Sequence, residues 1–153
     1  MTKRVIAVNR RAYRDYFVEE TYEAGIVLQG TEIKSIRAGR VSLREAHAQV
    51  VDGEMILFNA HIAPYEHGSY ANHPPRRPRK LLLHKYQIRR LAQEVQAKGY
   101  TLVPLRLYLK NGRAKIELGL VRGKRQRDKR LSIAKREAQR EMERALKARG
   151  RST

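Results

Sequence analysis

Hydrophobic and polar residues alternate along residues 100–110 and 113–121, which predicts two β-strands. The first strand is expected to present one apolar face made of Val103, Leu105, Leu107 and Leu109. The second is expected to bury Ala114, Ile116, Leu118 and Leu120. Asn111-Gly112 separates the two runs, and this dipeptide favours a two-residue turn because both of its residues tolerate positive φ. The pattern therefore predicts a β-hairpin.

A second alternating run covers residues 16–28 and predicts one long strand. Its apolar face is expected to carry Tyr16, Val18, Tyr22, Ala24, Ile26 and Leu28. Gly25 inside this strand indicates either a β-bulge or a place where another part of the chain comes close. Residues 43–51 and 55–62 predict two further strands around the turn signal Asp52-Gly53.

Helical spacing is restricted to two short segments of the first 121 residues. Residues 30–38 predict a helix of about two turns that stops at Gly39, and Ile88, Leu91 and Val95 predict a second that ends near Gly99. Residues 9–14 are interpreted as a polar, basic lead-in. The segment 63–80 holds four of the five prolines and has no regular pattern, so a functional or disordered loop is expected.

Five short strands with two inserted helices favour a mainly β fold, an antiparallel, partly open barrel of the oligonucleotide-binding type. A generic α+β sandwich is the alternative. The chain of 153 residues fits one compact domain, residues 1–122, followed by a basic C-terminal tail, residues 123–153.

The charge balance points to a polyanionic partner. The chain carries 34 Lys and Arg against 15 Asp and Glu, a formal net charge of +19. Nucleic acid is the first expected partner and an anionic membrane surface the second. No apolar run is long enough to span a membrane, and the chain lacks cysteine. A monomeric protein of the cytoplasm without disulfides fits this composition.

The tail concentrates the charge, because residues 122–153 carry a net charge of +9. Its apolar stripe at helical spacing is thin: Leu131, Ala134, Ala138, Met142 and Ala145. Arg136, Arg140 and Arg144 follow one another at i, i+4, where like charges destabilise an isolated helix. We expect a tail that is disordered alone and helical when phosphates neutralise these arginines. The alternative is a permanent helix packed on the barrel.

Residue patterns argue against catalysis. The serines lie outside any nucleophile motif, and the clustered Glu19, Glu20 and Glu23 lack an Asp or His at metal-ligand spacing. The five histidines include no helical i, i+4 pair. No enzyme activity, metal site or cofactor is therefore expected.

Basic and aromatic residues supply the candidate RNA contacts. Arg79 and Lys80 belong to a basic cluster at residues 76–80, and Tyr16 follows another at residues 10–14. Cations bind the backbone and tyrosine rings stack on bases, which suits single-stranded or looped RNA. Tyr16 also belongs to the apolar face of its strand, which favours a place in the core over a contact with RNA. Glu23 is expected to face outward, either accepting base N–H groups or pairing with Lys34 or Lys115.

Seven short motifs resemble the SsrA-binding protein family, also called small protein B, over nearly the whole chain. They are Asn9-Arg10-Arg11-Ala12, Tyr16-Phe17, Tyr22-Glu23-Ala24-Gly25-Ile26, Gly30-Thr31-Glu32-Ile33-Lys34-Ser35, Arg79-Lys80-Leu81-Leu82-Leu83, Thr101-Leu102-Val103-Pro104 and Gly123-Lys124-Arg125-Gln126 with Asp128-Lys129-Arg130. The resemblance implies an oligonucleotide-binding barrel that binds the tRNA-like domain of transfer-messenger RNA (tmRNA). It also implies delivery of that RNA to stalled ribosomes in trans-translation.

The resemblance also implies roles for individual residues. Asn9, Glu23, Leu82 and Lys115 would contact the tRNA-like domain. The tail would probe the 16S rRNA at the decoding centre and the empty mRNA channel, through Lys124, Arg127, Asp128, Lys129, Arg130, Arg136 and Arg140. Arg127 and Arg14 stand where some relatives carry histidine. The rivals are a constitutive ribosomal protein, which would associate with all subunits, and an RNA-processing enzyme.

Overall fold

The computed structural model of the chain describes residues 3–65, 72–124, 140–142 and 144. Just under half of these residues form strands, more than form helices. In chain order the elements are β1 (Lys3–Val8), α1 (Arg10–Asp15), β2 (Tyr16–Ile26), α2 (Gly30–Arg37), β3 (Val41–Ser42), β4 (His47–Val51), β5 (Glu54–Phe58), β6 (His61–Ile62), β7 (Arg79–Leu82), α3 (Lys85–Lys98), β8 (Thr101–Lys110) and β9 (Arg113–Gly123).

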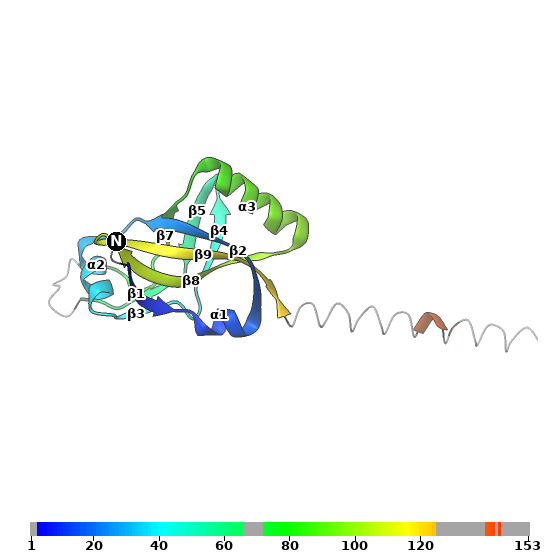
Figure 1. The fold of residues 1–153 in the computed structure, drawn as a ribbon, viewed down its shortest axis with the longest axis horizontal. Coiled ribbons are helices and arrows are strands. Elements are labelled where there is room, and N and C mark those ends of the chain that lie inside the picture. The colour runs from blue at the N-terminus through cyan, green and yellow to red at the C-terminus, as the bar shows by residue number, and fades with distance from the viewer. Residues whose placement is uncertain (1–2, 66–71, 125–139, 143, 145–153) are drawn as a thin grey trace, which may run out of the picture.

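Six of the described strands close into an antiparallel ring in the order β8, β4, β5, β7, β2 and β9, with β9 pairing back onto β8 (Figure 1). β9 takes one edge of β8, while β4 and β1 share the other, at Leu102 and at residues 106–110. β3 and β6 form a separate two-stranded sheet. The predicted antiparallel barrel is confirmed, although the predicted number of strands was too low.

Both predicted hairpins are present. Asp52 and Gly53 have φ values of 50° and 77°, and Asn111 and Gly112 have 52° and 77°. Lys110 pairs with Arg113 and Val51 with Glu54, so each loop contains two residues. Positive φ at both loop positions matches the right-handed twist of the flanking strands.

Two bulges overturn the predicted faces of β8 and β2. The β8–β9 register shifts between Pro104 and Arg106, so Leu102 and Leu107 both reach the main core although their spacing is odd. Val103 and Leu105 pack instead in a second cluster with Ala12 and Val121. The β2–β9 register shifts in the same way between Val18 and Glu20, and Val18 is exposed. The prediction of one uninterrupted apolar face on each strand was therefore wrong.

The main core fills the ring. Its largest fully buried members come from five strands and two helices: Ile36, Met55, Leu57, Ile62, Leu81, Leu91, Leu107, Ile116, Leu118 and Leu120. α2 and α3 follow the predicted segments, and each ends at a glycine with positive φ, Gly39 at 76° and Gly99 at 67°. Such a conformation is the usual end of a helix.

Neither β1 nor α1 was predicted from the pattern of residues, and interpreting residues 9–14 as a lead-in was wrong. β1 buries little, since only Ile6 and Ala7 pack against the core. Its pairing with β8 relies on backbone hydrogen bonds that any sequence can supply. α1 is one and a half turns long and buries only Ala12, so neither element leaves a periodic pattern.

Candidate nucleic-acid interface

Three predicted contact residues meet on neighbouring strands around Gly25. Gly25 of β2 pairs with Leu82 of β7 on one side and with Lys115 of β9 on the other. Directly paired residues share a face of the sheet, and Glu23 shares it because it lies two positions before Gly25. Leu82 is 53% exposed, so this face points outward. We call this set, Glu23, Gly25, Leu82 and Lys115 together with Arg113, the Gly25 surface.

A hollow of about 360 Å³ lies on the Gly25 surface. Its lining combines apolar and cationic groups: Gly25, Ile26, Leu28, Gln29, Gly30, Ile33, Leu82, Arg113, Ala114 and Lys115. A Cβ added at Gly25 would lie 3.2 Å from the Cβ of Leu82. The bare backbone of Gly25 therefore lets the Leu82 side chain lie flat across β2. The result is an apolar shelf beside two cations, which fits a base and its phosphates.

Glu23 is an ionised acceptor at the edge of this surface. Tyr108 donates its hydroxyl hydrogen bond to Glu23 Oε1 at 2.7 Å, and Lys110 Nζ lies 3.4 Å from both carboxylate oxygens. The hydrogen bond from Tyr108, aided by Lys110 and Lys115 against partial burial, lowers the pKa of Glu23. The carboxylate of Glu23 thus binds Tyr108 and Lys110 instead of the predicted Lys34 or Lys115. Lys115 acts on it only through its charge, which helps to lower the pKa.

The basic cluster 76–80 does not lie together on the surface. Lys80 is exposed and pairs with Glu54 at 3.2 Å, whereas the Arg79 side chain has no exposed area and ion-pairs with the equally buried Glu32. Arg79 also donates to the carbonyl oxygens of Ala60 and Pro75, at 2.8 and 3.1 Å. The prediction that Arg79 touches RNA was therefore wrong. Its carboxylate partner lies 47 residues away, which local sequence cannot reveal.

Asn9 is likewise buried and structural. Its Oδ1 accepts from the Ala12 N–H at 3.1 Å and caps α1, and its Nδ2 donates to the carbonyls of Leu43 and Pro104. These bonds hold α1 against β8 and the loop before β4. The side chain faces the protein interior, so the predicted direct contact of Asn9 with RNA does not fit this position.

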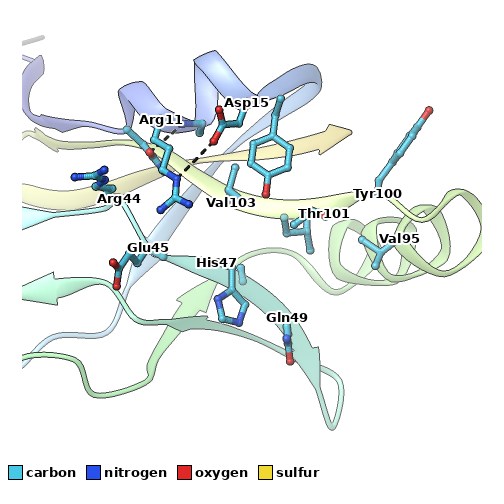
Figure 2. Close-up of a pocket in the computed structure, with 16 residues that line it drawn as sticks. Arg11, Asp15, Arg44, Glu45, His47, Gln49, Val95, Tyr100, Thr101 and Val103 are labelled. Atoms are coloured by element: carbon cyan, nitrogen blue, oxygen red, sulfur yellow. Dashed lines mark hydrogen bonds and ion pairs between the residues drawn. The ribbon is translucent and has the colours of Figure 1, made fainter. Parts of the chain in front are cut away.

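Tyr16 lies at the opposite end of β2 from the Gly25 surface, about 30 Å away at the usual rise of a strand. It lines a hollow of about 580 Å³ between α1, β4 and the start of β8 (Figure 2). Arg11 and Arg44 reach this hollow from two sides, Arg11 pairing with Asp15 at 3.5 Å, and His47 and Tyr100 add rings (Figure 2). Tyr16 stays a candidate for stacking, on a surface separate from Glu23.

The described part of the chain includes two of the predicted tail contacts. Lys124 follows β9, with its Nζ 4.9 Å from the centroid of the Phe17 ring. Arg140 is exposed. Arg127, Asp128, Lys129, Arg130 and Arg136 lie outside the described residues, as do the conformations predicted for the tail. No group of three or more potential metal ligands and no helix fit to span a membrane occurs among the residues described.

Known proteins are similar to this chain over nearly its whole length. The family model described as "SmpB protein" matches residues 6–148. A protein of Roseiflexus sp. (strain RS-1) named SsrA-binding protein is 63% identical over 150 residues, covering 97% of this chain and 95% of that protein. A protein of Geobacillus kaustophilus with the same name is 59% identical over 146 residues, covering 95% of this chain and 94% of that protein.

A solved structure resembles the fold as well as the sequence. One chain of the structure titled "tmRNA-SmpB: a journey to the center of the bacterial ribosome" superposes with a TM-score of 0.66 at 59% identity, covering 77% of this chain and 83% of that one. The match over residues 6–148, together with relatives near 60% identity over almost the full length, shows that the chain belongs to the SmpB protein family.

Proposed function

We propose that this chain is a non-enzymatic RNA-binding adaptor that binds the tRNA-like domain of tmRNA and takes it to stalled ribosomes for trans-translation in the cytoplasm. Its similarity to proteins named for binding SsrA supports the choice of RNA. The observation that carries the proposal is the convergence of Glu23, Leu82 and Lys115 around Gly25. These residues lie up to 92 positions apart in the chain, and the barrel brings them onto one outward face.

The chemistry of the Gly25 surface suits a folded RNA loop. Arg113 and Lys115 supply cations for two backbone phosphates, and the flat Leu82 side chain offers an apolar plane for a base. Glu23 accepts hydrogen bonds and repels phosphate, so it favours a base edge at its position. Cations on one side and a carboxylate on the other give the bound RNA a single orientation.

Glu23→Ala tests this assignment. The variant loses a contact to a base and leaves Tyr108 and Lys110 without their carboxylate partner. Binding of the isolated tRNA-like domain is therefore expected to weaken about 5-fold to 100-fold at physiological salt. Glu54→Ala is the matched control, since Glu54 pairs with Lys80 on the exposed face of the neighbouring strands β5 and β7. Fluorescence anisotropy measures both. Equal affinities for the two variants would remove Glu23 from the site.

The second half of the proposal concerns the tail. We expect residues beyond Lys124 to act at the ribosome, through their positive charge, rather than in binding the tRNA-like domain. A chain that ends at Lys124 is therefore expected to keep its affinity for that RNA within a few-fold and to lose tagging of stalled nascent chains. A large loss of RNA affinity on truncation would contradict this division of roles.

A further inference from the structure

The last residues of β9 are held by one neighbour only. Thr101, the first residue of β8, pairs with Val121, so β8 gives no partner to Arg122 and Gly123. On the other edge, Phe17 of β2 pairs with Arg122 and Tyr16 with Gly123. Figure 1 shows β9 ending beside the turn from α1 into β2. We call residues 122–124 the tail root, since the basic tail follows them.

An exposed aromatic ring lies under the tail root. Phe17 is 40% exposed. The guanidinium carbon of Arg122 lies 5.0 Å from the centroid of its ring, and Lys124 Nζ lies 4.9 Å from it. Both distances are within the range of cation–π attraction.

The two cations flank Gly123, the residue with the greatest backbone freedom at this point of the chain. Because Arg122 and Lys124 both contact Phe17, the ring restricts rotation about the glycine between them. Two further contacts act in the same direction: Arg122 ion-pairs with Glu19, and Lys124 Nζ lies 3.5 Å from the carbonyl oxygen of Tyr13. Phe17 is the member of this set that joins the root residues on both sides of Gly123.

We infer that Phe17 is a positioning residue that fixes the direction in which the chain leaves the barrel after Gly123. This inference goes beyond the Gly25 surface, from which Phe17 is separated by most of the length of β2. Its consequence for ribosome rescue rests on the role proposed above for the tail. The face of an aromatic ring holds Lys124 without adding a negative charge, so this contact does not neutralise the lysine, whereas Arg122 also pairs with Glu19.

The absence of cysteine allows a direct test in the full-length chain. Spin labels on Gln93→Cys, on the exposed side of α3, and on Gln126→Cys, two residues beyond the root, report their separation by double electron–electron resonance. Loss of two exposed cation–π contacts is expected to lower the ratio of docked to undocked root roughly 5-fold to 30-fold. Phe17→Ala is therefore expected to broaden the distance distribution, and Phe17→Tyr, which keeps the ring face, to leave it narrow.

An unchanged distribution in Phe17→Ala, at an unchanged melting temperature, would overturn the inference. So would a loss of affinity for the tRNA-like domain with no change in distance, since that result would make Phe17 an RNA contact. Lys124→Gln provides a second variant, expected to broaden the distribution less than Phe17→Ala because one contact remains.

Assays of RNA binding and of tagging distinguish this inference from the proposed role of the tail. Phe17→Ala is expected to bind the tRNA-like domain within 2-fold of the unmodified chain and to tag stalled chains several-fold more slowly, with rescue in Phe17→Tyr. Broadened distances with unchanged tagging would support the positioning of the root and overturn its importance for rescue. Tagging that is unaffected even by truncation at Lys124 would instead overturn the proposed function of the tail.

Discussion

Replacing Glu32 by glutamine is expected to be among the most damaging single changes to the barrel. The Glu32 and Arg79 side chains have no exposed area, and the Arg77 side chain is only 21% exposed. Glu32 accepts hydrogen bonds from both arginines and from the Gln29 N–H at 2.8 Å. Glu32→Gln keeps the shape of the side chain and removes its charge. The guanidinium of Arg79 then stays buried without a counter-charge.

The expected cost is about 3–5 kcal/mol, the usual penalty for removing one partner of a buried ion pair. This is a large part of the roughly 5–15 kcal/mol that holds a domain folded. For a domain of this size, a melting temperature lower by roughly 10–20 °C should follow. Because Arg79 begins β7, whose last residue is Leu82, a weaker pair is also expected to loosen the Gly25 surface.

Urea unfolding followed by circular dichroism measures the change in the free energy of unfolding. Glu45→Gln is the matched control, because Glu45 pairs with Arg76 at 3.4 Å and both side chains are more than half exposed, 61% and 51%. Exposed pairs contribute roughly 0–1 kcal/mol, so this variant is expected to unfold nearly like the unmodified chain. If Glu32→Gln costs no more than Glu45→Gln, the reasoning about burial is refuted.

The same carboxylate makes stability depend on pH. Burial by itself would raise the pKa of Glu32, but the hydrogen bonds from Arg77, the Gln29 N–H and Arg79 outweigh it and lower the pKa below its usual value. A group with a lowered pKa stabilises the fold fully above its unfolded pKa, near 4.3, and loses this contribution as pH falls through the folded value. Stability of the unmodified chain is therefore expected to decline below about pH 4.3, and Glu32→Gln to show a shallower decline.

Three further variants test the packing and the site. Gly119→Ala would place a Cβ 2.7 Å from Leu105 Cδ1 and should destabilise the barrel by about 1–3 kcal/mol in urea, while Gly30→Ala, in open space, should be close to neutral. Gly25→Ala is expected to displace Leu82, and so to weaken binding of the tRNA-like domain while changing the melting temperature little. An unchanged affinity would show that Leu82 does not contact the RNA. Tyr108→Phe removes the main cause of the low pKa of Glu23, so a carboxyl titration by nuclear magnetic resonance should show that pKa rising.

Local signals predicted both hairpins and the helices α2 and α3, but not α1. Asn111-Gly112 and Asp52-Gly53 occupy their turns with positive φ because this preference belongs to the residues themselves. Gly25 was expected at a bulge or a close approach, and the close approach to Leu82 is what the structure has, while the bulge lies at Glu19. A bulge is set by how neighbouring strands must bend to close a ring, and no single strand's sequence carries that requirement.

Some residues of the candidate site could be placed from local sequence, and others depend on strands that are distant in the chain. Alternation along β2 and β9 placed Glu23 and Lys115 outward, as the structure has them. Leu82 came only from the family resemblance, because an exposed leucine within Leu81-Leu82-Leu83 looks like core. The prediction that Arg79 contacts RNA was wrong because a run of basic residues is usually exposed to solvent. Only the fold shows that the buried Glu32 neutralises the Arg79 side chain.

The bulges of β8 and β2 affect the end of the barrel where the tail begins. The bulge at Leu105 turns that residue and Val103 away from the main core, toward Ala12 and Val121, and so creates the second cluster on which α1 packs. On the far side of the bulge at Glu19, β2 pairs with β9 as far as Gly123, past the end of β8, and Phe17 is exposed there. Because one extra residue reverses the alternation of a strand, Phe17 would lie on the opposite face of β2 without the bulge at Glu19. Both bulges thus lie toward the end of the barrel that carries the tail root, whereas β2 and β9 pair without a shift from Glu20 to Gly25, where the Gly25 surface lies.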